Sequence, residues 1–515
     1  MMTEKRIPRE QRERELIIAD NGSCIVLASA GSGKTTILVE KLIKEAEKEI
    51  QHFNYVAITF TNKAATEVKE RLSNKHLSNA HATTIDGFLE SEILRNFIKV
   101  KYPSVKEYNQ SYESKYKMNS YDDLINLIIE EKILGSYTNK KEKNGRNFKF
   151  ELALNLIEEF KVVQEYIKFK YKMIFIDEYQ DCDQSMNNLF IYLKDNLNIR
   201  LFIVGDIKQS IYQWRGASPR YLEELTENEG FSTYTLIENF RSQPSIVDYS
   251  LAISKGFIVD ILAEDKNVYY YNPTDNLPHK EIISMLIEKG IININDENII
   301  LGGSNVEIEN LYNQLSEEIR GNFTYIRKNS ISHCPNKLIL EGIAKYYFNT
   351  EYNQYDFVEG LDIDISNQDV QALYEKLNLI KGNLNEENII EIFNFLGMIP
   401  EKFEEEEETK ILIDVLRNPL NSTVYNPVKE QNMIMTTHAS KGLEADNVII
   451  FTEYYFDKYS NILDEEKNYV GITRAKNKLI LVDNGEELYK YTVSRLIHTN
   501  NSNQFNFHDF IEEIN

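Results

Sequence analysis

The sequence predicts an α/β protein in which parallel strands alternate with helices, as in doubly wound folds. The prediction rests on segments in which a short apolar strand ends in a polar turn. The first of these turns is glycine-rich, and a stretch with helical apolar spacing follows it. The segments are Cys24–Thr35, Tyr171–Asp181 and Arg200–Ala217.

The first turn, Ala28–Thr35, has the composition and spacing of a phosphate-binding loop, with alanine in place of glycine at its first position. Gly31 and Gly33 allow successive N–H groups to point inward, and the helix N-terminus adds partial positive charge. Lys34 is expected to reach the β- and γ-phosphates, and the Thr35 hydroxyl is expected to bind Mg²⁺. The predicted nucleotide contacts are Ala28, Ser29, Ala30, Gly31, Ser32, Gly33, Lys34, Thr35 and Thr36.

The other two strands end in residues that suit phosphate chemistry. Asp177 can hold Mg²⁺ through its water shell, and Glu178 can orient and deprotonate an attacking water. Gln209, after the third strand, can contact a γ-phosphate. Tyr212 and Trp214 follow it and offer stacking platforms for nucleic-acid bases, although a lone tryptophan is more often part of a core.

Phosphoryl transfer also requires positive charge near the developing oxyanion, which an arginine often supplies. Arg241 and Arg474, far downstream of the loop, are the candidates, although either one alone would be interpreted as a surface residue. The predicted catalytic residues are Lys34, Asp177, Glu178, Gln209, Arg241 and Arg474, with ATP and Mg²⁺ as cofactors and Thr35 and Asp177 as metal ligands.

Composition limits the remaining possibilities. A chain of 515 residues is expected to form several domains. No apolar run approaches the length of about 20 residues that a membrane-spanning helix needs, and the charged N-terminus does not resemble a secretory signal. The net charge of −23 argues against a protein that coats nucleic acid but allows a local basic groove. The 3 cysteines have no metal-ligand spacing, which favours a reducing, cytoplasmic setting.

The glycine-rich turn, the acidic pair, the Gln209 segment and the two arginine segments together resemble the motifs of the superfamily 1 helicases of the UvrD/Rep/PcrA type. The resemblance implies two RecA-like motor domains with helical insertions and an ATP-dependent DNA helicase or translocase of 3′-to-5′ polarity. It rests on segments that occur in the family's order: Ala28–Thr35, Ile58–Ala65, Asp177–Asp181, Val204–Ala217, Asn239–Ser242, Thr437–Glu444 and Tyr469–Lys476.

The family resemblance also implies roles for individual residues. Phe240 would stack on the nucleotide base, and Glu444 would contact the ribose. Arg241 and Arg474 would come from the second motor domain and complete the ATP site. The implied contacts with single-stranded or end-containing DNA are Phe60, Thr61, Asn62, Tyr212, Trp214, Arg215 and His438.

A narrower resemblance connects the chain to the helicase-like subunits of Gabija anti-phage defence systems. It implies a hetero-oligomer with a partner, a GajA-like OLD-family endonuclease. Two alternatives stay open: a DNA-end-sensing ATPase switch that activates the nuclease with little unwinding, or a stand-alone DNA repair helicase. The short C-terminal remainder argues against a fused nuclease, and the intact motifs argue against a degenerate interaction module.

Departures from the family pattern affect one expected DNA contact and the expected base contact. Asp86 stands where the family usually has a DNA-contacting histidine, and a carboxylate there would repel phosphate. The adenine-recognising glutamine should precede the loop, and Gln11 is the candidate despite imperfect spacing. The choice between ATP and GTP therefore stays open.

The motifs and the composition predict the following domain limits. Residues 1–85 and 170–235 form RecA-like domain 1A, and residues 86–169 form a helical insertion, 1B. Residues 236–330 and 429–500 form RecA-like domain 2A, and residues 331–428 form a reduced helical domain, 2B. Residues 501–515 are expected to be a loosely held polar tail. The expected strands are Cys24–Ala28, Tyr55–Phe60, Met173–Asp177, Leu201–Val204, Glu297–Gly303, Asn432–Thr436, Asn447–Phe451 and Lys478–Val482.

Overall fold

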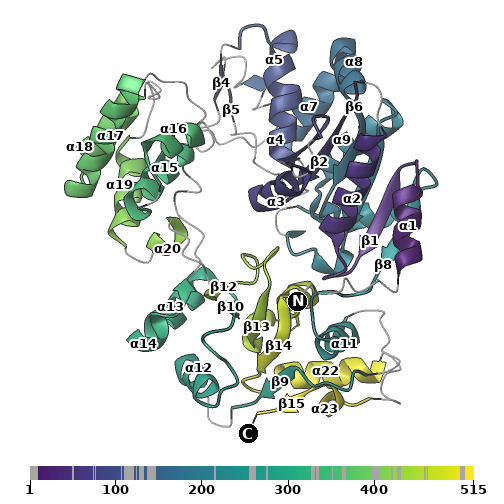
Figure 1. Ribbon diagram of the computed structural model, residues 1–515, viewed down its shortest axis with the longest axis vertical. Coiled ribbons are helices and arrows are strands. Elements are labelled where there is room, and N and C mark those ends of the chain that lie inside the picture. The colour runs from purple at the N-terminus through teal and green to yellow at the C-terminus, as the bar shows by residue number, and fades with distance from the viewer. Residues whose placement is uncertain are drawn as a thin grey trace.

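The computed structural model contains two α/β lobes, each built on a parallel sheet, together with helical regions that are attached to them (Figure 1). The predicted fold class is confirmed. The structure describes residues 10–48, 52–73, 75, 77–105, 107–109, 121–122, 125–126, 133–135, 147–213, 216–254, 262–273, 277–325, 331, 334, 336–350, 352–361, 367–396, 405–418, 421–425, 431–457, 460, 462–498 and 505–514.

The first lobe contains a six-stranded sheet in the order β3-β2-β6-β7-β1-β8, and all of its pairings are parallel. Because the strands are parallel, the turns that follow β1, β2, β6 and β7 lie at one edge of the sheet. The strands are β1 (Cys24–Ala28), β2 (Asn54–Thr59), β3 (Ala80–Thr84), β6 (Tyr171–Ile176), β7 (Arg200–Gly205) and β8 (Ser232–Leu236).

Both faces of this sheet are buried, which explains why its central strands are almost wholly apolar. Side chains alternate between the faces: Ile25 packs into one core cluster, whereas Val26 packs into the other. The packing helices are α1 (Gln11–Ala19), α2 (Lys34–Glu47), α3 (Asn62–Ser73), α9 (Gln184–Asp195) and α10 (Arg220–Thr226).

The segment between β3 and β6 is mostly helical where the structure describes it. Phe148 and Leu156 belong to the same core cluster as Ile25, so this region shares a core with the first lobe. Its elements are α4 (Ile85–Leu89), a π-helical turn (Glu90–Leu94), α5 (Arg95–Lys101), β4 (Glu107–Asn109), β5 (Ile133–Gly135), α7 (Phe148–Glu159) and α8 (Lys161–Lys170).

The second lobe contains a seven-stranded parallel sheet in the order β11-β12-β10-β13-β14-β9-β15. Its strands are β9 (Val268–Tyr271), β10 (Asn298–Gly302), β11 (Thr324–Tyr325), β12 (Asn432–Thr436), β13 (Ala445–Phe451), β14 (Ala475–Val482) and β15 (Glu512–Glu513). Its helices are α11 (Pro244–Ile253), α12 (His279–Glu288), α13 (Asn305–Gln314), α14 (Glu317–Arg320), α21 (Glu465–Ile472), α22 (Glu487–His498) and α23 (Phe507–Phe510).

Three buried asparagines align the central strands of the second sheet. Asn298 on β10 pairs in register with Asn432 on β12 and with Asn447 on β13. Asn298 Nδ2 donates to Asn432 Oδ1 at 2.6 Å, and Asn447 Nδ2 donates to Asn298 Oδ1 at 2.8 Å. A shift of one residue would break these bonds and bury unpaired amides, so the asparagines stabilise one register.

A separate helical region lies between β11 and β12 in the chain and has its own apolar core. Figure 1 shows these green helices apart from the sheet of the second lobe. They are α15 (Lys337–Phe348), α16 (Gln354–Leu361), α17 (Asn367–Gly382), α18 (Glu386–Phe395), α19 (Glu405–Arg417) and α20 (Ser422–Tyr425). Within the described part of the chain, no helix is both long enough and apolar enough to cross a membrane.

The expectation of a loosely held polar tail at 501–515 is wrong for residues 505–514. In this segment β15 pairs with β9, with Glu512 opposite Tyr269. Phe507 and Phe510 are buried in the core of the second lobe. The polar run that suggested a tail, residues 500–504, hid the apolar residues that follow it.

Candidate functional site

The glycine-rich turn lies between β1 and α2, so strand, turn and helix follow one another as predicted. Gly31 and Gly33 have φ angles of 73° and 82°, a left-handed conformation that favours glycine. The hydroxyl of Ser32 donates to the Ser29 carbonyl oxygen at 2.8 Å and closes the turn. The turn therefore has the backbone conformation that a phosphate cradle requires.

Two ammonium groups converge on this turn. Lys34 Nζ donates to the Ala28 carbonyl oxygen at 3.1 Å and lies 3.7 Å from Asp206 Oδ2. Lys208 Nζ donates to Ser29 Oγ at 3.2 Å. Burial lowers the pKa of Lys208, and the nearby charge of Lys34 lowers it further. Lys208 was not among the predicted site residues, because a lysine beside Gln209 carries no signal of its own in the sequence.

The acidic pair lies directly after β6. Asp177 is buried, and the backbone N–H of Glu178 donates to Asp177 Oδ1 at 2.9 Å. Burial and the adjacent Glu178 charge raise the pKa of Asp177. Burial also opposes ionisation of Glu178, but the ammonium groups of Lys441 and Lys34 lower the pKa of Glu178 below its usual value. Glu178 is therefore ionised at neutral pH.

Gln209 and Arg474 connect the two lobes. Gln209 Nε2 donates to Asp206 Oδ2 at 2.7 Å within the first lobe. Arg474, from the second lobe, is 2% exposed, and its guanidinium donates to the Val470 and Leu443 carbonyl oxygens. One terminal nitrogen of Arg474 lies 3.4 Å from Gln209 Oε1. Burial lowers the pKa of Arg474 to about 10, so the group stays charged at neutral pH.

Arg241 lies close to Arg474 on the side of the second lobe. Its Nε donates to Glu444 Oε2 at 2.6 Å, and one terminal nitrogen donates to the Thr473 carbonyl oxygen at 3.1 Å. The charge of Arg241 contributes to the lowered pKa of Arg474. The structure therefore brings both predicted arginines and Glu444 together.

Asn239 holds the Arg241 segment against the glycine-rich turn. Asn239 Nδ2 donates to the Ala30 carbonyl oxygen at 2.9 Å, and Asn239 Oδ1 accepts the N–H of Arg241 at 2.8 Å. The N–H of Phe240 donates to the Gly31 carbonyl oxygen at 2.9 Å. A Cβ atom at Gly31 would lie 2.6 Å from the Asn239 side chain, so glycine is required there for a second reason.

Phe240, the predicted base-stacking residue, is 44% exposed and lies beside an arginine. The guanidinium carbon of Arg14 is 5.3 Å from the ring centroid of Phe240, and Arg14 also donates to the Ser32 carbonyl oxygen. Sequence reasoning missed Arg14 and considered Gln11 instead. Gln11 Nε2 donates to Glu15 Oε1 at 2.9 Å, within the same helix.

A second set of contacts between the lobes involves the turn after β12. Lys441 Nζ donates to the Asp181 carboxylate. His438 Nε2 lies 3.2 Å from the Ile211 carbonyl oxygen, and its ring centroid is 5.9 Å from that of Tyr212. The structure thus brings together Tyr212 and His438, two of the predicted DNA contacts.

The other predicted DNA contacts lie after β2, at the same sheet edge as the glycine-rich turn. Phe60 packs against the core of the first lobe, and Thr61 accepts the N–H of Ala64 through its hydroxyl. Asn62 begins α3. The predicted contacts that lie outside the described residues are Trp214 and Arg215.

Asp86 does not carry an uncompensated charge. Lys149 Nζ lies 3.2 Å from Asp86 Oδ1 and also pairs with Glu90. Lys149 is buried, so its charge is directed to these two carboxylates. The position where the family usually has histidine is therefore part of an ion-pair cluster on α4 and α7.

The oxygen donors at the sheet edge fit a hard cation such as Mg²⁺. Thr35 supplies a hydroxyl in the first turn of α2, and Asp177 and Glu178 supply carboxylates at the end of β6. Mg²⁺ usually binds through one or two carboxylates together with the phosphates of its nucleotide. Among the described residues there is no cluster of three or more histidine, cysteine or acidic side chains that would form an independent metal site.

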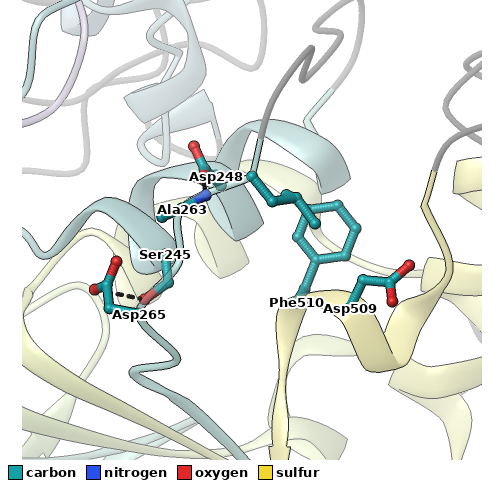
Figure 2. A pocket seen from close by; sticks show the side chains of 7 residues that line it. Ser245, Asp248, Ala263, Asp265, Asp509 and Phe510 are labelled. Atoms are coloured by element: carbon teal, nitrogen blue, oxygen red, sulfur yellow. Dashed lines mark hydrogen bonds between the residues drawn. The ribbon is translucent and has the colours of Figure 1, made fainter.

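A small acidic pocket in the second lobe has different chemistry (Figure 2). Asp248 accepts the N–H of Ala263 at 2.8 Å, and Ser245 donates to Asp265 at 3.3 Å. The carboxylates that line the pocket would repel a phosphate group, and the polar groups of the lining form hydrogen bonds with one another. The lining residues are Ser245, Asp248, Leu262, Ala263, Asp265, Asp509 and Phe510.

Comparison with known protein families agrees with this geometry. A model described as an AAA domain matches residues 12–215, and a model of the UvrD-like helicase C-terminal domain matches residues 433–482. The first match contains the glycine-rich turn and the acidic pair, and the second contains Lys441 and Arg474. The chain belongs to the family of UvrD-like helicases, as the sequence predicted.

Individual relatives give the same result. The chain is 36% identical to Gabija protein GajB of Bacillus cereus (strain VD045), over 93% of this chain and 96% of that protein. It is 23% identical to the ATP-dependent DNA helicase PcrA of Staphylococcus epidermidis, over 92% of this chain and 82% of PcrA. The corresponding protein of Staphylococcus aureus (strain Mu50) is 22% identical. The relation to GajB therefore extends over almost the whole chain.

Proposed function

We propose that this protein is an ATP-driven motor on single-stranded DNA, a helicase or translocase with 3′-to-5′ polarity. The observation that carries the proposal is the guanidinium of Arg474, which extends from the second lobe to within 3.4 Å of Gln209 in the first. A site that needs groups from both lobes can convert a change in its ligand into a movement of one lobe against the other.

Each predicted site residue of the first lobe has a role in this proposal. Lys34 and the N–H groups of the glycine-rich turn bind the phosphates. Glu178 is ionised, so it can take a proton from the attacking water. Bound Mg²⁺, held by Thr35 and Asp177, would neutralise charge on the phosphate oxygens. Gln209 contacts the γ-phosphate through its buried amide.

The second lobe completes the site. Arg241 and Arg474 supply positive charge where the γ-phosphoryl group leaves. Phe240 stacks on the base, with Arg14 beside its ring, and Glu444 contacts the ribose. When hydrolysis removes the γ-phosphate, the arginines lose part of their attraction and the lobes separate.

Among the described residues, the proposed DNA contacts lie where the two lobes meet and along the adjacent edge of the first sheet. Tyr212 and His438 are already in ring contact. Alternating contacts with the bases would move the strand as the lobes open and close. The proposed contacts are Phe60, Thr61, Asn62, Tyr212, Trp214, Arg215 and His438.

The similarity to Gabija protein GajB supports a role in anti-phage defence. In this role the chain forms a hetero-oligomer with a GajA-like OLD-family endonuclease in the cytoplasm. A reducing compartment suits the three cysteines Cys24, Cys182 and Cys334, which are all buried and form no disulfide bond. Co-purification of the chain with the nuclease encoded beside it tests the partnership, and failure of the two to associate would contradict it.

We also propose the domain limits that the sequence predicts up to residue 500. The sheet of the first lobe uses strands from 24–59, 80–84 and 171–236, which supports 1A as 1–85 and 170–235. The helical region with its own core supports 2B as 331–428. Limited proteolysis followed by mass spectrometry tests the limits, because cleavage should fall near residues 330 and 429 rather than within the sheets.

One alternative function is supported by a particular observation. Asp86 pairs with Lys149, so an ion-pair cluster lies at the position where the family usually contacts DNA. The loss of that contact would weaken the DNA binding that a processive motor needs. The chain would then be a DNA-end-sensing ATPase switch for the nuclease. Strand displacement on a forked duplex, with and without the nuclease, separates the two functions, because robust unwinding by the isolated chain would count against the switch.

The ATP site itself is tested by Lys34→Ala. The variant should lose ATP hydrolysis, because the ammonium group between loop and phosphates is removed. Lys490→Ala, on the exposed surface of α22, is the matched control and should hydrolyse ATP at the normal rate. Unchanged turnover by Lys34→Ala would show that the site has been assigned wrongly.

A further inference from the structure

Lys441 of the second lobe contacts groups in the first lobe that belong to different parts of the site. Its side chain is 10% exposed. Lys441 Nζ donates to the Asp181 carboxylate and, at 3.1 Å, to the Gln209 carbonyl oxygen. The same nitrogen lies 3.7 Å from Glu178 Oε2. An ammonium group has three N–H donors, and three first-lobe oxygens lie around this one.

The same ammonium group lies 5.1 Å from the ring centroid of Tyr212. His438, from the same turn as Lys441, lies against that ring and reaches the Ile211 carbonyl oxygen. A cation is attracted to the face of an aromatic ring, and a nucleic-acid base stacks on such a face. A base that displaces the Tyr212 ring would therefore also displace the ammonium group of Lys441.

We infer that Lys441 is a positioning residue that transmits the binding of a DNA base at Tyr212 to the carboxylate of Glu178. This inference rests on the proposed function, because it assumes that Glu178 acts on the attacking water. Without DNA, the ammonium group stays close to Glu178 and Asp181. When DNA moves Tyr212, the ammonium group shifts away and leaves the Glu178 carboxylate available to the water.

The distances make this transmission efficient. The attraction between an ammonium and a carboxylate falls with their separation and is strong where water is excluded. Lys441 is shielded from solvent, so a displacement of the ammonium by about one or two ångströms changes its effect on Glu178 substantially. A residue that merely joined the lobes would influence both the DNA-free and the DNA-bound rates equally.

The test measures steady-state ATP hydrolysis by the full chain with and without single-stranded oligonucleotide, and takes the ratio of the two rates. Lys441→Met should lower this ratio by about tenfold, which lies within the usual range of coupling between two sites. Lys441→Arg, which keeps the charge, should retain a larger ratio than Lys441→Met. Lys376→Met is the matched control, because it removes an ion pair with Glu391 in the separate helical region.

A second variant keeps the test valid if Lys441→Met fails to fold. Lys441→Gln keeps a polar side chain with N–H donors, but it has no charge. It should lose the stimulation by DNA as Lys441→Met does. In a chain that already carries Tyr212→Leu, neither substitution at Lys441 should lower the ratio further. The Tyr212 ring, through which DNA is proposed to act on Lys441, is absent from that chain.

The outcomes separate this inference from the proposed function. If the natural chain shows no stimulation of ATP hydrolysis by DNA, the proposed motor itself is refuted and the inference falls with it. If the natural chain is stimulated and the folded Lys441→Met and Lys441→Gln variants keep the full ratio, only the role of Lys441 is wrong. If ATP hydrolysis with DNA and without DNA falls by the same factor, Lys441 is only a structural contact between the lobes, and the inference is refuted.

Discussion

Replacement of Arg474 by methionine should stop most ATP turnover while it leaves ATP binding largely intact. The guanidinium is buried, lies 3.4 Å from Gln209 Oε1 and stays charged at neutral pH. An arginine that stabilises phosphoryl transfer contributes on the order of 10³ to 10⁵ in rate. Because Arg241 remains beside the phosphates, we expect the lower end, about a thousandfold or about 4 kcal/mol of barrier.

The same substitution also affects folding. The guanidinium donates to the carbonyl oxygens of Val470 and Leu443, and its loss leaves these oxygens without that donor. Each such loss in a buried site destabilises a protein by about 1 to 3 kcal/mol. A thermal unfolding scan therefore has to show that the variant is folded at the temperature of the assay.

The assay compares kcat and the equilibrium affinity for ATP in the natural chain, in Arg474→Met and in a control. Arg495→Met is the control, because Arg495 also pairs within the second lobe, with Glu465, and is not one of the proposed nucleotide contacts. ATP affinity of Arg474→Met should change by less than about tenfold, since Lys34 and the turn still bind the phosphates. A folded Arg474→Met variant with kcat reduced by less than about tenfold would refute the reasoning.

Three further predictions concern stability and nucleotide binding. Asn298→Ala should lower the free energy of unfolding by about 3 kcal/mol, because Asn432 Oδ1 and the carbonyl oxygens of Asn293 and Asp296 lose Asn298 Nδ2 as their donor. Chemical denaturation measures this loss, and a value below about 1 kcal/mol would contradict the idea that the asparagines stabilise the register. Phe510→Ala should lower that free energy by about 3 kcal/mol through a cavity in the second lobe; an unchanged melting temperature would mean that the C-terminal segment does not pack there. Arg14→Met should weaken ATP binding about three- to tenfold, because the base loses the cation beside its stacking ring; a titration with fluorescent nucleotide measures this, and equal affinities would exclude Arg14 from the base site.

The alternation of apolar strands and helices was sufficient to predict both sheets. Expected strands such as Asn432–Thr436 and Cys24–Ala28 have the observed bounds. Strands at or near the edges were missed, because their composition is mixed: β3 reads Ala-His-Ala-Thr-Thr, and β15 consists of two glutamates. Such strands form because a neighbouring strand offers free backbone N–H and C=O groups for pairing. The composition of the edge strand itself does not indicate this pairing.

In the candidate site, too, some residues could be predicted from the sequence and others could not. Lys34, Asp177 and Glu178 could be predicted because each follows a strand in a motif with fixed spacing. Arg14 and Lys208 could not, because their importance depends on where α1 and the turn after β7 lie in space. Nothing in the local sequence places Arg14 beside Phe240, which is more than two hundred residues away.

Contacts between the lobes were the hardest to foresee. The resemblance to helicases implied that Arg474 would complete the site, but it gave no role to Lys441, which contacts Asp181 across the same boundary. The sequence separation of 260 residues between these two partners leaves no periodic pattern from which the pairing could be derived.

The central claim is that one ligand site uses both lobes and thereby couples nucleotide to DNA. Fluorescence anisotropy of a labelled single-stranded oligonucleotide measures this directly, with the full chain free of nucleotide, with ADP, and with a non-hydrolysable ATP analogue. DNA affinity should differ between the ADP and ATP-analogue states by at least about fivefold. Equal affinities in all three states, in a chain that demonstrably binds the nucleotides, would contradict it.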